Sequence, residues 1–143
     1  MFIKQLSIFV ENKQGRLEKI ISELGKNDIN ISALSMADTT DFGILRIIAD
    51  NPEKAKQALN DIGVVAKLTD VMAVVIDDNA GGLASVLGYI TQAEVSIEYM
   101  YAFLGKVQGK ALMVMKVNDA AKAEQILADN GVALAEPVDV YRI

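Results

Sequence analysis

The sequence contains no cysteine, no histidine and no tryptophan, and only two of its 143 residues are proline. The lack of cysteine and histidine excludes disulfides, thiol nucleophiles, Cys or His metal sites and histidine acid–base catalysis. Carboxylates, lysine, tyrosine and serine remain as catalytic candidates, but the one acidic pair, Asp77-Asp78, has the pattern of a turn. We therefore expect a protein without catalytic residues, metal or cofactor.

Basic residues are also scarce, since 14 lysines and arginines stand against 19 acids and leave a net charge of −5. Nucleic acids and anionic membranes are bound by basic surfaces, which this composition does not favour. RNA-binding proteins built from a four-stranded sheet also need aromatic residues on a central strand, and residues 44–49 contain none. We expect neither nucleic-acid nor membrane binding.

Long hydrophobic runs and targeting signals are missing as well. No apolar run approaches the ~18–20 residues of a membrane span, and the N-terminus lacks the pattern of a signal peptide. We therefore expect a cytoplasmic protein. The mean hydropathy of +0.27 is high for a small chain, so we expect some apolar surface to be buried against a partner subunit.

Hydrophobic periodicity divides the first half into strands and helices. Leu17, Ile20, Ile21 and Leu24 recur at the spacing of an amphipathic helix, and the capping residues of segment 50–53 start a second helix. Strands are predicted at residues 2–10, 29–36, 44–49 and 64–68. The order β-α-β-β-α-β in roughly 70 residues is that of the ferredoxin-like unit.

The second half repeats this pattern. The helical spacing that begins at Leu17 begins again 66 positions later at Leu83, and Gly63 recurs 68 positions later as Gly131. The connection at residues 104–110 is therefore two residues longer than its counterpart in the first half. The predicted fold is α+β: two tandem ferredoxin-like units with antiparallel sheets and helices on one face, at residues 1–69 and 70–143.

Several predicted strands are apolar on both faces. Residues 71–76 are apolar at every position, and residues 44–48 and 112–115 are nearly so. A sheet with helices on one face normally alternates apolar and polar residues. We therefore expect the second face to be buried by sheet-to-sheet or edge-to-edge packing, within the chain or between two chains, and we expect a homodimer; an exposed surface with scattered apolar residues is the alternative.

Two related turns join a strand to a helix: residues 12–17, NKQGRL, and residues 78–83, DNAGGL. The start of a helix presents unpaired backbone N–H groups and a positive dipole end, which suit a carboxylate. Glycine permits close approach of a ligand to the backbone, and asparagine offers both a donor and an acceptor to a zwitterion. The alternative is that Asn12 and Asp78 only cap helices or stabilise turns.

The whole layout, with these turns and the segments Asn27–Ile31 and Glu94–Ile97, resembles the ACT domain, a regulatory module that binds small molecules. The resemblance covers the chain twice. It implies a free amino acid bound at an interface between two ACT units, between the turn of one unit and the second strand of the other. The implied ligand-binding residues are Asn12, Lys13, Gln14, Gly15, Arg16, Leu17, Asn30, Ile31, Asp78, Asn79, Ala80, Gly81, Gly82, Leu83, Ser96 and Ile97.

The resemblance predicts a non-catalytic amino-acid sensor that regulates a separate metabolic enzyme. Ser96 stands where the first half has Asn30, so the two halves are not equivalent, and the turn at residues 12–15 is the favoured site. The alternative function is an interaction subunit of a metabolic enzyme with no ligand of its own. Alternating Tyr99, Tyr101 and Phe103 fit either packing or an apolar wall for the ligand.

Overall fold

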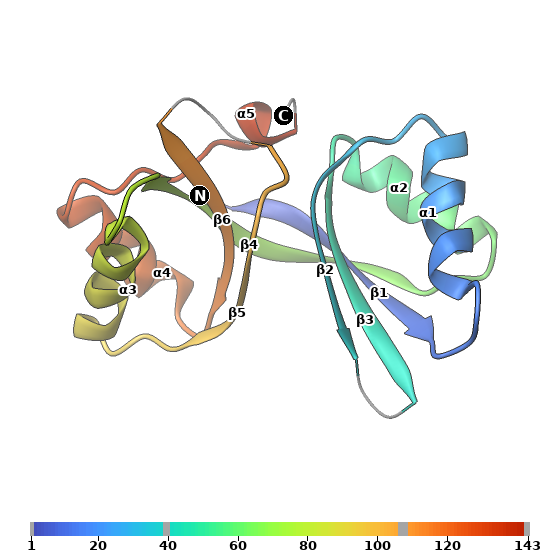
Figure 1. Ribbon diagram of the computed structural model, residues 1–143, viewed down its shortest axis with the longest axis horizontal. Coiled ribbons are helices and arrows are strands. Elements are labelled where there is room, and N and C mark those ends of the chain that lie inside the picture. The colour runs from blue at the N-terminus through green and yellow to red at the C-terminus, as the bar shows by residue number, and fades with distance from the viewer. Residues whose placement is uncertain (1, 39–40, 106–108, 142–143) are drawn as a thin grey trace. The chain divides into compact units, whose positions relative to one another are not determined.

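The computed structural model describes residues 2–38, 41–105 and 109–141 (Figure 1). Its elements are β1 (Ile3–Glu11), α1 (Arg16–Lys26), β2 (Ile31–Asp38), β3 (Phe42–Ala49), α2 (Pro52–Asp61), β4 (Ala66–Asp77), α3 (Gly82–Gln92), β5 (Ile97–Ala102), β6 (Lys110–Val117), α4 (Ala120–Asp129) and α5 (Pro137–Val140). None of the helices in these ranges has the length and hydrophobicity needed to cross a bilayer.

Contacts between residues divide the chain into two compact units. The first unit contains residues 4–69 and Tyr141, and the second contains residues 70–140 with Phe2 and Ile3. Tyr141 is tied to the first unit because its hydroxyl accepts a 2.8 Å hydrogen bond from the Lys4 N–H. The assignment of residues 1–69 and 70–143 to two domains stays a prediction, because contacts do not test independent folding.

The first unit has the ferredoxin-like strand order β2-β3-β1-β4. Strands β1 and β3 are antiparallel, with Leu6 opposite Ile47, and β2 and β3 are antiparallel, with Leu34 opposite Ile47. Helices α1 and α2 lie on one side of this sheet (Figure 1). The predicted β-α-β-β-α-β layout of this unit is therefore present.

The second unit has the strand order β4-β6-β5, with α3 and α4 on one side (Figure 1). The place of a fourth strand is taken by residues 133–135, which form one bridge, between Val74 and Leu134. Two hydrogen bonds hold this segment: the Val75 N–H donates to the Ala133 carbonyl at 3.0 Å, and the Ala135 N–H donates to the Ala73 carbonyl at 2.8 Å. Helix α5, which the periodicity does not predict, follows this segment.

Strand β4 differs from the prediction of two strands at residues 64–68 and 71–76. It is one strand of 12 residues that continues through Thr69 and Asp70, where the two units meet in the sequence. The junction contains neither glycine nor proline, and its Asp70 stays in the extended conformation of the strand. The last strand of the first unit is therefore also the first strand of the second.

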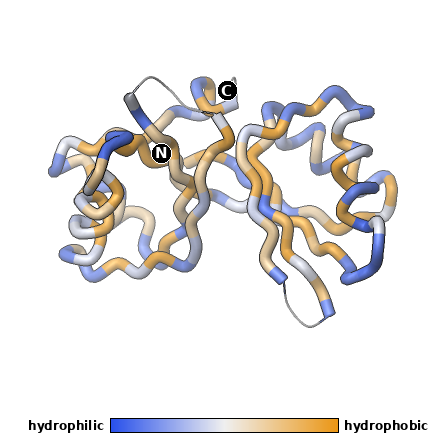
Figure 2. The backbone as a smooth tube through the Cα atoms, viewed as in Figure 1, coloured by the Kyte–Doolittle hydropathy of each residue, from blue (hydrophilic) through white to orange (hydrophobic). Residues whose placement is uncertain are grey.

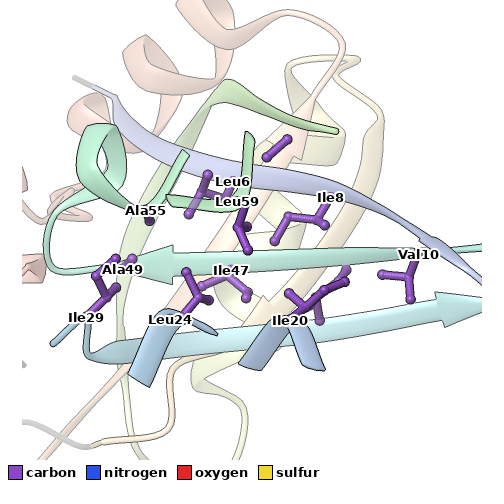
Figure 3. Close-up of a cluster of buried hydrophobic side chains, with 12 residues drawn as sticks. Leu6, Ile8, Val10, Ile20, Leu24, Ile29, Ile47, Ala49, Ala55 and Leu59 are labelled. Carbon is purple, nitrogen blue, oxygen red and sulfur yellow. The ribbon is translucent and has the colours of Figure 1, made fainter. Parts of the chain in front are cut away.

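The core of the first unit lies between its sheet and its helices (Figure 3). Leu6, Ile8 and Val10 occupy alternate positions of β1 and face Ile20 and Leu24 of α1. Leu45 and Ile47 of β3, with Ala55 and Leu59 of α2, complete this layer. The helical spacing predicted Ile20 and Leu24 correctly, whereas Leu17, in the first turn, is 39% exposed.

The strands carry mostly hydrophobic residues, and the turn between β1 and α1 is hydrophilic (Figure 2). On the face away from the helices, Phe9 and Phe42 are nonetheless about half exposed. The apolar strands predict that this second face of the sheet is buried. At Phe9 and Phe42, a single chain leaves the face exposed. The turn predicted at residues 37–43 and the long connection at 104–110 include residues 39–40 and 106–108, which lie outside the described residues.

Replacement of Leu24 by alanine should lower the free energy of unfolding by about 2–5 kcal/mol, because it removes a fully buried side chain from the core. Leu17→Ala is a matched control on the same helix. Its side chain is 39% exposed, so its removal should lower stability clearly less than that of Leu24, by about 1 kcal/mol or less. Chemical denaturation followed by far-UV circular dichroism measures both, and equal losses would contradict this description of the core.

Candidate functional site

The two turns share one backbone conformation. Gly15 and Gly81 have φ angles of 81° and 87°, in the left-handed region that favours glycine, and each is the N-cap of the following helix. Neither α1 nor α3 receives a side-chain cap hydrogen bond in the described part of the chain. Asn12 and Asp78 are therefore not the helix caps that the alternative interpretation expects.

The other two long helices begin differently. Asn51 caps α2 by accepting a hydrogen bond from the Lys54 N–H, and Asp119 caps α4 by accepting one from the Lys122 N–H. A side chain thus satisfies part of the first turn in α2 and α4 but not in α1 and α3. The uncapped starts of α1 and α3 offer backbone N–H groups to an anion.

The backbone hydrogen bonds of the two turns also correspond. The Asn12 N–H donates to the Asp41 carbonyl at 3.4 Å, and the Asp78 N–H donates to the Gly109 carbonyl at 3.1 Å. Each turn closes in the same way, with the N–H of the first helical residue donating to a carbonyl three positions earlier.

The structure places the predicted residues of both turns at corresponding positions. The first turn contains Asn12, Lys13, Gln14 and Gly15, and α1 opens with Arg16 and Leu17. The second turn contains Asp78, Asn79, Ala80 and Gly81, and α3 opens with Gly82 and Leu83.

The predicted residues of the strand starts lie elsewhere in each unit. Asn30 and Asp50 are joined by two hydrogen bonds of 3.1 Å, in which the Asn30 N–H donates to Asp50 Oδ1 and the Asp50 N–H donates to the Asn30 carbonyl. Ser96 and Asn118 form the same pair of bonds. Helix α1, of 11 residues, separates Asn30 from the first turn by about 16 Å at 1.5 Å per residue. No single unit brings the two groups of predicted residues together.

Ile31 and Ile97 have a packing role in the structure. Both are half-buried and pack against the core of their own unit. The structure thus places Asn30 and Ser96 at exposed strand starts, with the isoleucine that follows each one directed to packing.

The strand-end carboxylates make different ion pairs in the two units. Glu11 pairs with Lys13 at 3.2 Å and with Arg16 at 3.5 Å. The hydrogen bond and positive charge of Lys13, with a smaller effect of Arg16, hold the pKa of Glu11 below its ordinary value. At the equivalent position Asp77 pairs with Lys110, at the start of β6. Arg16, a predicted ligand contact, is thus engaged by Glu11.

A cavity adjoins the end of the first strand in each unit. The cavity of the second unit has a volume of about 490 Å³ and is lined by Asn79, Ala80, Gly81 and Gly82 of the predicted site. The cavity of the first unit has a volume of about 120 Å³, and Arg16 is the predicted residue that lines it. All residues around the smaller cavity have counterparts around the larger one, 66 or 68 positions later.

Sequence reasoning missed several residues of the larger cavity. Ser85, Tyr89, Lys110 and Asn130 line it together with the turn. Lys110 is the first residue of β6 and Asn130 follows α4, so only the fold brings them to the turn. The offsets of 66 and 68 positions between the two halves are visible in the sequence. They do not show that Phe9 and Phe42 line one cavity, or that their counterparts Val75 and Lys110 line another.

The ion pair predicts that nuclear magnetic resonance titration of Glu11 gives a pKa below that of a glutamate in a peptide. Lys13→Ala should raise this pKa, because it removes the largest cause of the shift. Because the folded-state pKa is lowered, any stabilisation is present above the ordinary pKa and is lost as pH falls through the lowered value. Lys26→Ala, at the far end of α1, should leave the Glu11 pKa unchanged; an unchanged value in Lys13→Ala would contradict the pairing.

Comparison with solved structures identifies close and distant relatives of this fold. Protein BT0572 from Bacteroides thetaiotaomicron is 40% identical, with a TM-score of 0.93 over 100% of this chain and 98% of that one. The ligand-free regulatory subunit of aspartate kinase from Thermus thermophilus is 16% identical, with a TM-score of 0.66 over 90% of each chain. At this lower identity the likeness concerns the fold alone.

The sequence comparisons agree with this likeness. No curated protein matches the chain. The sequence model described as the ACT domain pair matches residues 1–142, which is nearly the whole length. With its doubled glycine turns and two helix-covered units, this chain belongs to the ACT domain family as an ACT domain pair.

Proposed function

We propose that this chain is a non-catalytic regulatory protein that binds a free amino acid and regulates a separate metabolic enzyme. The observation that carries the proposal is the ACT domain pair over residues 1–142, in which both turns begin uncapped helices. The regulatory subunit of aspartate kinase has this fold, and regulation of an enzyme on another chain is the role proposed here.

The chemistry of the turns supports an amino acid as the ligand. An α-carboxylate suits the uncapped start of α1 or α3, where backbone N–H groups and the helix dipole favour an anion. Asn12 and Asn30 add neutral donors and acceptors for the two charged ends of a zwitterion. Because Asn30 and the first turn lie at opposite ends of α1, a ligand that contacts both must lie between two ACT units.

The proposed contacts are the two turns and the two strand starts. They comprise residues 12–17 and 78–83, together with Asn30, Ile31, Ser96 and Ile97. Regulation would follow from ligand binding at an interface between units, where a change in packing can be transmitted to a partner. We further propose that the protein acts in the cytoplasm, without nucleic-acid or membrane binding.

An interaction subunit with no ligand of its own is the second candidate. One observation favours it: β2 is an edge strand of its unit, and its side chains Leu34 and Met36 are 37% and 45% exposed. An edge strand with exposed apolar side chains can pair with another chain. The same edge supports the proposed homodimer.

A thermal-shift screen of the free amino acids tests the proposed function. An amino acid that binds the folded state should raise the melting temperature, with a stabilisation of about 2.7 kcal/mol at a concentration of 100 times its Kd. Asn30→Ala should melt at a similar temperature without ligand but show a smaller shift with it. The absence of a shift for every amino acid at millimolar concentration would reject the sensor and favour the interaction subunit.

Light scattering at micromolar concentration tests the homodimer. The expected mass is twice the chain mass of 15.4 kDa. Leu34→Lys with Met36→Lys should shift the protein toward the monomer, because buried lysines at a strand edge oppose pairing. Val138→Lys, at a half-exposed position of α5, is the control and should remain dimeric. A monomeric wild-type protein would contradict the dimer.

A further inference from the structure

Four large side-chain differences, with the smaller exchanges of Ile20 for Val86 and of Glu11 for Asp77, distinguish the walls of the two cavities. Around the smaller cavity stand Phe9, Arg16, Phe42 and Val65; their counterparts around the larger one are Val75, Gly82, Lys110 and Ala133. From the first unit to the second, three of these four replacements reduce the size of the side chain. The fourth exchanges the aromatic ring of Phe42 for the flexible cation of Lys110. The volume increases from about 120 Å³ to about 490 Å³, and only the larger value falls within the range of about 300–1,000 Å³ typical of small-molecule sites.

The opening at Gly82 is fixed by the backbone. A Cβ atom at this position would collide with the carbonyl oxygen of Asp77. A side chain such as that of Arg16 therefore cannot occupy this wall of the larger cavity unless the turn moves. The second turn is thus built without the side chain that helps to close the cavity of the first.

Charged and apolar groups are separated within the larger cavity. Asp77 and Lys110 form an ion pair at its rim, where their side chains are 59% and 47% exposed. Val75, Val86 and Val132 supply an apolar wall, and Val86 belongs to the buried core of the unit. A carboxylate beside an ammonium group can bind both ends of a zwitterion, since each charged end meets a group of opposite sign.

We infer that the chain holds its ligand in the cavity of the second unit, that the ligand is an α-amino acid with an apolar side chain, and that the first unit has no equivalent site. This inference rests on the proposed function and places the ligand beside the second turn, in contrast to the preference for residues 12–15 drawn from the sequence. Asp77 binds the α-ammonium group, Lys110 binds the α-carboxylate, and the side chain lies against the valines.

Calorimetric titration of the full chain with L-leucine tests the site. The wild-type protein should bind one L-leucine per chain. Val75→Phe with Ala133→Val, which copies the first unit into the second, should weaken binding by about tenfold or more because the cavity is filled. Phe9→Val with Val65→Ala, the reverse exchange in the first unit, is the matched control and should leave the affinity within about twofold.

Two fragments of L-leucine test the binding of its ammonium and carboxylate groups. 4-Methylpentanoate lacks the ammonium group and 3-methylbutylamine lacks the carboxylate, so each should bind about tenfold or more weakly than L-leucine. Lys110→Met should reduce the affinity for L-leucine but not for 3-methylbutylamine. Equal affinities of all three probes would overturn the assignment of Asp77 and Lys110.

The remaining outcomes separate this inference from the proposed function. Unchanged L-leucine affinity in the variant with Val75→Phe and Ala133→Val, or two binding sites per chain, would overturn this inference. The proposal that the chain binds an amino acid would still hold. Binding of polar or charged amino acids but of no apolar one would overturn the apolar ligand class, and no binding of any amino acid would overturn both proposals. If the double variant does not fold, Ala133→Val alone, at an exposed position, provides the same comparison.

Discussion

The positive φ angle at the entry to α1 and α3 is the constraint on which the rest of the site depends. A residue with a β-carbon is strained in this conformation, so Gly15 and Gly81 set the direction in which each helix leaves its strand. Because glycine has no side chain, the helix also starts without a cap, and its first N–H groups remain available. One backbone angle therefore fixes both the packing of the helix on its sheet and the chemistry of the turn.

The two halves have kept this backbone and changed the side chains around it. Their turn hydrogen bonds correspond one by one, and so do the bonds that join Asn30 to Asp50 and Ser96 to Asn118. The differences lie where side chains from separate elements meet beside the turn. The two halves thus share the backbone conformation of the turn and differ in the side chains that line the cavity beside it.

The periodicity of the sequence was sufficient to predict the ferredoxin-like layout, because burial of one helix face and one sheet face imposes regular spacing. It located the buried Ile20 and Leu24 but also included Leu17, which the first turn of α1 leaves partly in solvent. Spacing cannot distinguish these cases, since it describes direction around the helix and not position along it. It also separated the two parts of β4, because the polar residues Thr69 and Asp70 interrupt the apolar pattern of a strand that continues through them.

The candidate site was less accessible to sequence reasoning. The turns were visible as local motifs, because glycine and asparagine have strong backbone preferences. The cavity was not, because its walls come from β4, α3, β6 and the segment after α4. Its size depends on which side chains these segments bring together, and that information becomes available only with the strand order and register.

Strand β4 contributes side chains to the cores of both units. Ala66 and Leu68 contribute to the core of the first unit, and Met72, Val74 and Ile76 contribute to the core of the second. All five occupy even positions of one uninterrupted strand, so the same set of alternating residues serves two cores. Each part of the strand thus directs its even-numbered residues into the core of its own unit. One uninterrupted strand contributes side chains to both cores, so the two units follow one another in the described chain without a separate linker segment.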